Sequence, residues 1–183
     1  MNLGTCYHCG QPVPPAVDLA TDIDGQRRAM CCVGCQAVAQ AIVENGLADY
    51  YRNRDALPSA PREAMPKIVE GLQLYDHADF QKSFVRVLGD GPDHGEREAS
   101  LILEGITCSA CIWLNEQHLS RLVGVTAVDI NYATRRARVR WDERRIKLSE
   151  ILTAIAAIGY RAYPYDATKC EELARQERRR ALW

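Results

Sequence analysis

The chain has 183 residues and a formal net charge of −1 at pH 7, so its charge gives no support for binding nucleic acid. Hydrophobic residues make up 47% of the sequence, which is enough for a core, and the length suits one domain or two small ones. No apolar run approaches the roughly 18 residues of a membrane helix. Residues 1–15 lack the basic and apolar regions of a signal peptide, so we expect the chain to begin in the cytosol.

Eight cysteines in a reducing compartment need a role other than disulfide formation. Six of them form three Cys-x-x-Cys pairs, a spacing that indicates metal binding or redox chemistry. The pairs are Cys6 with Cys9, Cys32 with Cys35, and Cys108 with Cys111. Cys31 and Cys170 are left over, and we expect no functional role for Cys170.

Residues 1–50 are expected to form a small cysteine-rich metal-binding segment with a zinc-ribbon-like fold. Its two cysteine pairs have the separation of a tetrahedral four-thiolate site, for which Zn(II) is the usual occupant. Cys31 is an alternative to Cys32 as a ligand, and His8 is a weaker candidate. The segment has few large apolar side chains, so a metal would have to stabilise it. A structural Zn(II) and a Cu(I) ion in transit both remain open here.

Two stretches between the cysteine-rich regions carry weaker patterns. An apolar stripe after Cys35 predicts a helix, which Gly46 ends. Residues 51–97 are expected to be a linker with a partly ordered apolar part, because prolines and charges dominate its start and its apolar residues follow no clear period. A glycine-rich and aspartate-rich break at 89–93 closes it.

Residues 98–165 carry the clearest secondary-structure pattern. Alternating apolar residues predict strands, and apolar stripes that end at a glycine predict helices. The expected elements are a strand at 100–104, a helix from the third cysteine pair to Gly124, strands at 128–132 and 137–141, a helix from a cap at Ser149 to Gly159, and a strand at 160–163. This βαββαβ order is that of the ferredoxin-like fold, so we expect an α+β protein.

The third cysteine pair, Cys108 and Cys111, falls where the first strand passes into the first helix. A helix N-terminus stabilises negative charge, so both thiols should have lowered pKa values. Two thiolates without a nearby His or carboxylate suit Cu(I) better than Zn(II), which takes four ligands. The alternatives are a pair of small buried residues, and a redox dithiol of thioredoxin type, which normally sits on a larger sheet.

Four other features of this half of the sequence bear on its chemistry. Asn115 interrupts the apolar stripe of the first helix, and a buried amide there needs hydrogen-bond partners. We expect His118 to lie on the surface. The arginine row formed by Arg136, Arg138 and Arg140 is expected to be solvated. Residues 166–183 form a basic tail that ends in Ala-Leu-Trp, a pattern that fits the cytosolic edge of a membrane helix or a frayed terminal helix.

The sequence Gly-Ile-Thr-Cys-Ser-Ala-Cys at 105–111 resembles the metal-binding loop of the heavy-metal-associated (HMA) domain of copper chaperones and copper-transporting P-type ATPases. The family usually carries Met where this chain has Ile106, at a position that packs under the loop. The runs at 111–116 and 131–134 resemble one subgroup of these pumps, which serves the assembly of cbb-type cytochrome c oxidase. That subgroup also begins with a cysteine-rich segment and carries Asn where this chain has Asn115.

The resemblance implies a cytosolic metal-binding region at the cytoplasmic face of the cell membrane, with a first membrane span expected after the basic tail. It would accept Cu(I) from a donor chaperone and pass it to the remaining ATPase domains, or regulate them. A dithiol oxidoreductase and a free-standing copper chaperone or sensor are the alternatives. The chain has neither the Asp-Lys-Thr-Gly-Thr phosphorylation motif nor a P-loop, so it cannot hydrolyse ATP by itself.

Overall fold

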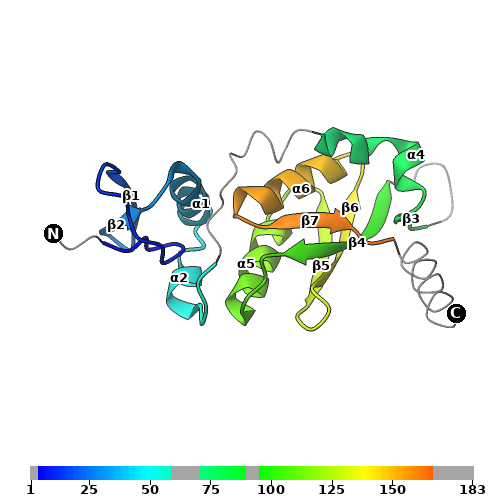
Figure 1. The fold of residues 1–183 in the computed structure, drawn as a ribbon. Coiled ribbons are helices and arrows are strands. Elements are labelled where there is room, and N and C mark those ends of the chain that lie inside the picture. Colours follow the sequence, from blue (N-terminus) through cyan, green and yellow to red (C-terminus); the bar gives the residue numbers. More distant parts are fainter. Residues whose placement is uncertain (1–3, 59–70, 90–94, 167–183) are drawn as a thin grey trace, which may run out of the picture.

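A computed structural model describes residues 4–58, 71–89 and 95–166. The basic tail after residue 166, Cys170 included, lies outside the described residues. Among those described, no helix combines the length and the apolar character needed to cross a membrane. The chain forms two units (Figure 1), which we call the amino-terminal unit, residues 4–58, and the carboxyl-terminal unit, residues 71–89 and 95–166.

The amino-terminal unit is a β-hairpin packed against two helices. Its strands β1 (Leu19–Ile23) and β2 (Gln26–Met30) pair antiparallel. The two turn residues, Asp24 and Gly25, both have positive φ, as a tight hairpin turn requires. Helix α1 (Val33–Glu44) follows, and then the short helix α2 (Asp49–Asn53).

Helix α1 follows the predicted apolar stripe. Cys35, Val38 and Ile42 are buried along one face. The backbone at Cys32 is extended, and its sulfur accepts a hydrogen bond from the backbone N–H of Cys35, so Cys32 acts as the N-cap. Gly46 follows the helix with a φ of 68°, which allows the chain to reverse there.

The carboxyl-terminal unit has the predicted βαββαβ order and the ferredoxin-like sheet. Helices α5 and α6 cover one face of that sheet (Figure 1). In space the sheet runs β3-β4-β6-β5, and β7 also pairs with β4. Its elements are β4 (Glu96–Glu104), α5 (Ser109–Ser120), β5 (Val125–Asn131), β6 (Arg136–Asp142), α6 (Leu148–Ala157) and β7 (Arg161–Pro164).

The first part of this unit, residues 71–89, adds elements that the sequence pattern did not predict. It forms the 3-10 helix η1 (Leu72–Asp76), the helix α4 (Ala78–Gln81) and the strand β3 (Val85–Val87). Strand β3 pairs with residues 97–99 of β4, while β7 pairs with residues 101–104, so the two share one edge. The sheet is therefore one strand larger than the basic fold.

Two local predictions in this unit are corrected. The N-cap of α6 is Lys147, and Ser149 instead donates a hydrogen bond from its hydroxyl to Asp76 at 2.6 Å. Asp76 also accepts from the Ser149 backbone N–H at 2.8 Å, so η1 supplies the carboxylate that caps α6. Tyr132, expected in a strand, lies past the end of β5 and is exposed.

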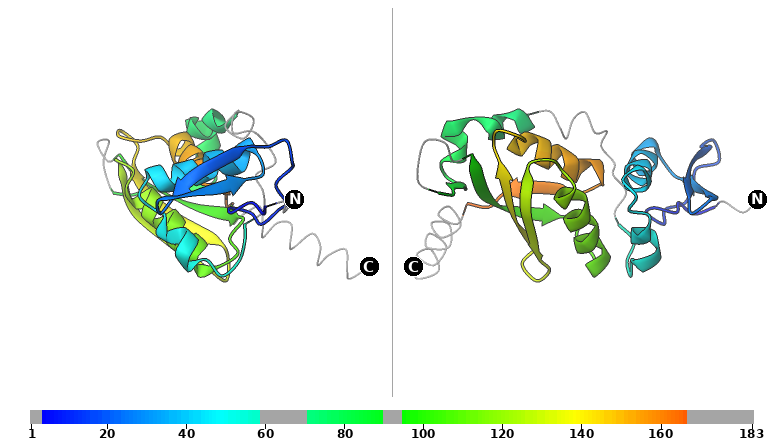
Figure 2. Two further views of the ribbon diagram at one scale, coloured as in Figure 1. Left: turned by 90° about the vertical axis from the view of Figure 1, so that its left-hand side faces the viewer. Right: turned by 180° about the vertical axis from the view of Figure 1, so that it is seen from behind.

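The two units contact each other through their helices. Helix α2 packs against α5, and α1 packs against α6 (Figure 2). Arg121, at the end of α5, donates to the backbone carbonyl of Asn45. A Cβ placed on Gly159 would lie 3.1 Å from Val38, so α1 approaches the turn after α6 closely. Buried residues of both units accordingly form one continuous apolar cluster.

Candidate metal centres

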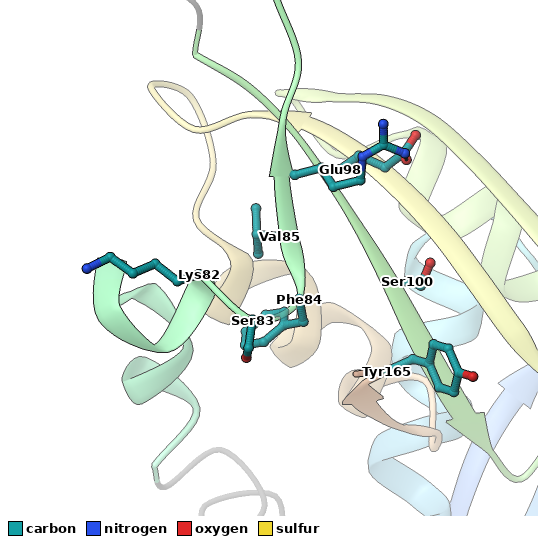
Figure 3. A pocket seen from close by; sticks show the side chains of 8 residues that line it. Lys82, Ser83, Phe84, Val85, Glu98, Ser100 and Tyr165 are labelled. Atoms are coloured by element: carbon teal, nitrogen blue, oxygen red, sulfur yellow. Dashed lines mark ion pairs between the residues drawn. The ribbon is translucent and has the colours of Figure 1, made fainter. Parts of the chain in front are cut away.

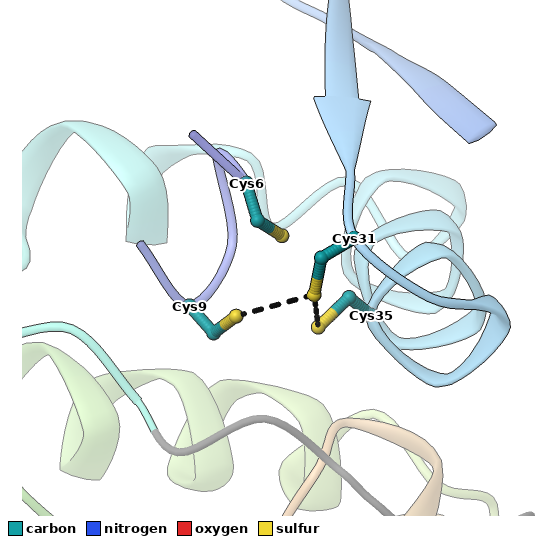
Figure 4. A group of neighbouring side chains, drawn as sticks. All are labelled: Cys6, Cys9, Cys31 and Cys35. Carbon is teal, nitrogen blue, oxygen red and sulfur yellow. Dashed lines mark hydrogen bonds between the residues drawn. The ribbon is translucent and has the colours of Figure 1, made fainter. Parts of the chain in front are cut away.

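The first candidate centre is a group of four cysteines in the amino-terminal unit, which we call the four-cysteine group (Figure 4). Cys6 and Cys9 lie on a tight loop, Cys31 follows β2, and Cys35 lies in the first turn of α1. Their four sulfur atoms lie within 4.8 Å of one another. A tetrahedral Zn(II) with Zn–S bonds of about 2.3 Å would place its sulfurs about 3.8 Å apart. The separations of 3.6 Å from Cys9 to Cys31 and 3.7 Å from Cys31 to Cys35 fit that geometry.

The structure brings the Cys31 sulfur into this group and leaves Cys32 out, which favours the alternative to the Cys32 ligand that the sequence left open. The reason is local. Cys32 has a φ of −157° and turns its sulfur to the backbone N–H of Cys35, where it caps α1. His8 also lies outside the group, because its Nδ1 pairs with the Tyr51 hydroxyl at 3.0 Å. Burial, with the charge of Arg54, lowers the pKa of His8 to about 4, so its ring is neutral at pH 7.

The electrostatics of the four-cysteine group suit a bound cation. Burial opposes the charge on Cys6, yet backbone hydrogen bonds from Cys9, Cys31 and His8 lower its pKa below the usual value. Burial and a hydrogen bond with Cys9 raise the pKa of Cys31 to about 12. Burial and the charge of Cys6 raise the pKa of Cys35 as well. Such thiols resist carrying several negative charges together unless a metal ion neutralises them.

The second candidate centre is the predicted pair at the start of α5. Cys108 is the N-cap and Cys111 lies in the first turn, with their sulfurs 3.6 Å apart. That distance is far longer than a disulfide bond, and both thiols are free. Thr107 contacts the Cys111 sulfur at 3.5 Å, and Ile106 is buried beneath the loop as the pattern implied. Among the described residues, no group of three or more metal-binding side chains includes this pair.

The predicted pKa shift holds for Cys108. Burial raises its pKa, but hydrogen bonds from the backbone N–H groups of Asp55, Cys111 and Ala56 outweigh burial and hold the pKa below the ordinary value. Cys108 is 4% exposed and Cys111 is fully buried. The thiolate is thus favoured at Cys108 but shielded from solvent.

Asn115 is buried, as its place on the apolar stripe implied. Its side-chain amide donates to the Cys111 carbonyl at 2.9 Å, so it braces the first turn of α5 behind the metal loop. Its Oδ1 has no hydrogen-bond partner among the described residues. His118 corrects the expectation of a surface position: it is buried, and its Nε2 lies 3.0 Å from the Ala154 carbonyl of α6.

Two tyrosines beside the second centre were not anticipated from the sequence. Burial, Tyr50 and Cys111 raise the pKa of Tyr160, which follows α6. Burial and the charge of Cys111 also raise the pKa of Tyr50, on α2 of the other unit, to about 12. The hydroxyl of Tyr50 is buried without a partner among the described residues. Only the juxtaposition of the two units reveals its place, because Tyr50 lies far from Cys111 in the sequence.

The arginine row on β6 does not form a third centre. Arg140 pairs with Glu98 at 2.6 Å, and Arg136 lies over the Tyr165 ring at 3.7 Å. A hollow nearby (Figure 3) is lined by residues of β3 and β4, by residues just before β3 and by Tyr165, and its lining includes no cysteine or histidine. Arg136 and Arg140 are thus each engaged within the molecule.

Comparison with known families matches both halves of the chain. Residues 5–89 match the family described as "Putative metal-binding domain of cation transport ATPase". Residues 100–161 match the heavy-metal-associated domain. The four-cysteine group lies in the first match and the Cys108–Cys111 pair in the second.

Three curated relatives illustrate the similarity. "Nitrogen fixation protein FixI" of Bradyrhizobium diazoefficiens is 28% identical over 88 residues, which cover 48% of this chain and 12% of that protein. "Probable copper-transporting ATPase PacS" of Synechococcus elongatus is 32% identical over 83 residues, 45% of this chain and 11% of the relative. "Mercuric transport protein periplasmic component" of Pseudomonas aeruginosa is 34% identical over 61 residues, which cover 33% of this chain and 67% of that protein. The chain thus spans about one eighth of the first two relatives.

Among solved structures, oxidized MerP from Ralstonia metallidurans CH34 is 30% identical, with a TM-score of 0.37. The match covers 38% of this chain and 96% of that chain.

Proposed function

Since this chain joins a match to the putative metal-binding domain of cation transport ATPases, at residues 5–89, to a heavy-metal-associated domain, at residues 100–161, we propose that it is the amino-terminal metal-binding region of a copper-transporting P-type ATPase. Its cargo is Cu(I), carried by Cys108 and Cys111. The relatives named as copper-transporting ATPases support this proposal. In this reading the region lies at the cytoplasmic face of the membrane, and its partners are a donor chaperone and the remaining ATPase domains.

The observation that carries the proposal is the pair of free thiols at the head of α5. Their sulfurs lie 3.6 Å apart without a third protein ligand among the described residues. A soft, low-coordinate thiolate site suits Cu(I), whereas Zn(II) in a structural site takes four ligands. The match of residues 100–161 to the heavy-metal-associated domain favours a metal site over the dithiol oxidoreductase alternative.

Transfer at this site is an exchange of ligands. The two cysteines bind as thiolates, so any remaining thiol proton passes to solvent when Cu(I) arrives. Bonds from copper to the donor's sulfurs break as bonds to Cys108 and Cys111 form, and copper stays Cu(I) throughout. Backbone N–H groups of Asp55, Cys111 and Ala56 lower the pKa of Cys108 and so favour the thiolate that begins the exchange.

For the four-cysteine group we propose a structural Zn(II). Four sulfurs at near-tetrahedral separations are the donor set of structural zinc sites. The ion would join the Cys6–Cys9 loop to the end of β2 and the start of α1, and would stabilise a unit that has a small core.

The test is a competition for Cu(I) between the full chain and a chromogenic Cu(I) chelator. We expect Cys108→Ser and Cys111→Ser each to abolish tight binding of one equivalent. Cys32→Ser is the matched control, because Cys32 lies outside both groups and serine also caps helices well. Full retention of that equivalent in Cys108→Ser would overturn the proposal.

A further inference from the structure

The Cys108–Cys111 loop is covered by the stretch of the amino-terminal unit that follows α2. Helix α2 packs against α5, the helix that begins at this loop, and the backbone N–H groups of Asp55 and Ala56 lie near enough to lower the pKa of Cys108. Tyr50 is 1% exposed and lies within electrostatic reach of both sulfurs of the pair. The second centre is therefore completed by residues from outside its own unit. We call residues 50–57 the bridging segment.

The bridging segment is fastened to the Cys6–Cys9 loop at its other side. Arg54 donates from Nη1 to the His8 carbonyl at 2.7 Å and from Nη2 to the Tyr7 carbonyl. Its guanidinium also lies 5.2 Å from the centre of the Tyr7 ring, a cation–π contact. The Leu57 side chain lies so close to Gly10 that a Cβ there would be 2.4 Å from it.

Adjacent tyrosines on α2 face different centres. Tyr51 pairs through its hydroxyl with His8, which lies between Cys6 and Cys9. Its neighbour Tyr50 is buried where α2 packs against α5, and the charge of Cys111 raises its pKa. The two tyrosine rings meet edge to face with centroids 5.1 Å apart. The loop that supplies two sulfurs to the four-cysteine group thus holds the segment that covers the other centre.

We propose that the bridging segment is a lid on the Cys108–Cys111 site, and that metal in the four-cysteine group holds the lid closed. Loss of that metal frees the Cys6–Cys9 loop, releases Arg54 and opens the way to Cys108. Incoming copper ligands need this access, because both sulfurs are buried when the lid is closed. This link between the two centres depends on the proposed function in one respect: it takes both centres to be metal sites.

The lid is tested in the copper-free full chain by the rate at which iodoacetamide alkylates Cys108 and Cys111, read by peptide mass mapping. Arg54→Ala removes the fastening, so we expect the rates to rise about tenfold, the change that a 1.4 kcal/mol loss of closure gives. Arg52→Ala is the matched control, because Arg52 lies two residues before Arg54 and, within the part of the chain that the structure describes, forms ion pairs with Asp24 and Asp49. Equal rates in wild type and Arg54→Ala would overturn the lid.

The link between the centres is tested by comparing the chain loaded with Zn(II) with the chain treated with EDTA. We expect chelation to raise the alkylation rate of Cys108 in wild type and to add little in Arg54→Ala, because both act through one segment. If chelation raised the alkylation rate of Cys108 by the same factor in wild type and in Arg54→Ala, the coupling would be overturned.

If Arg54→Ala loses the dispersed amide resonances of the folded chain, Arg54→Lys replaces it. Lysine keeps the positive charge but cannot make the bidentate contact with the His8 and Tyr7 carbonyls. Copper binding that survives in Cys108→Ser would overturn the proposed function alone, because alkylation is measured without copper.

Discussion

At the scale of single residues, the choice between Cys31 and Cys32 decides which sulfurs form the four-cysteine group. We predict that Cys31→Ser weakens Zn(II) binding by on the order of a hundredfold or more, because four ligands share roughly 10–16 kcal/mol of binding free energy. Cys32→Ser should bind as wild type does, since its sulfur only caps α1. Zinc retained after dialysis against graded chelator measures both. Strong loss in Cys32→Ser alone would contradict the assignment.

His118 gives the carboxyl-terminal unit a dependence on pH. Burial lowers its pKa, and the nearby charge of Arg121 lowers it further, against the hydrogen bond to the Ala154 carbonyl. In the unfolded chain His118 binds a proton near pH 6.5, whereas in the folded chain it binds that proton only at a lower pH. Its contribution to stability is therefore full above pH 6.5 and falls as the pH drops toward the lower folded pKa.

We predict that His118→Gln, which keeps a donor for the Ala154 carbonyl but does not titrate, loses less stability than wild type between pH 7 and pH 5. Urea unfolding at the two pH values measures the difference. An unchanged difference would show that His118 does not titrate as described.

At the scale of elements, the turn after α6 packs closely against α1 of the other unit. Gly159 has a φ of 91°, and a Cβ there would lie 3.1 Å from Val38 of α1. We predict that Gly159→Ala costs about 1–2 kcal/mol for the left-handed backbone and a further amount for the contact. Gly25→Ala is the control, because Gly25 has a φ of 74° and open space around it.

Urea unfolding gives both costs, and the excess of Gly159→Ala over Gly25→Ala reports the contact between the units. If the two substitutions lowered the free energy of unfolding equally, α1 would not pack closely against this turn.

Elements that depend on local residue patterns could be predicted from the sequence. Elements that depend on contacts with residues far away in the sequence could not. Alternation at Ala137, Val139 and Trp141 identified β6, because one buried face leaves a period of two. The cap of α6 was missed, because its carboxylate comes from Asp76 in another element. Strand β3 was missed for a similar reason: three residues have no recognisable period, and pairing with β4 alone makes them a strand.

The candidate centres follow the same division. Cys108 and Cys111 were predictable, since a strand, a Gly and a helix start place them locally. The exchange of Cys32 for Cys31 depends on the backbone angles of adjacent residues, which spacing does not encode. Tyr50 joins the second centre only because one unit docks on the other.

At the scale of the whole molecule, metal and folding should be coupled differently in the two units. We predict that a strong chelator unfolds the amino-terminal unit, because its small core does not offset the conformational entropy of ordering the chain. The carboxyl-terminal unit should persist, since its core residues, such as Leu101 and Ile151, are buried without help from metal. Amide resonances of both units, followed in one sample during chelation, report each separately. If the amide resonances of the amino-terminal unit stayed dispersed after chelation, metal would not be what stabilises its fold.

The most direct test of the central claim is copper-edge X-ray absorption on the Zn(II)-loaded chain with one equivalent of Cu(I), combined with amide shifts from the same sample. We predict a shell of two sulfurs around copper, with shifts centred on residues 105–111. A shell dominated by nitrogen or oxygen, or shifts confined to the loop of Cys6 and Cys9, would contradict the assignment of Cu(I) to Cys108 and Cys111.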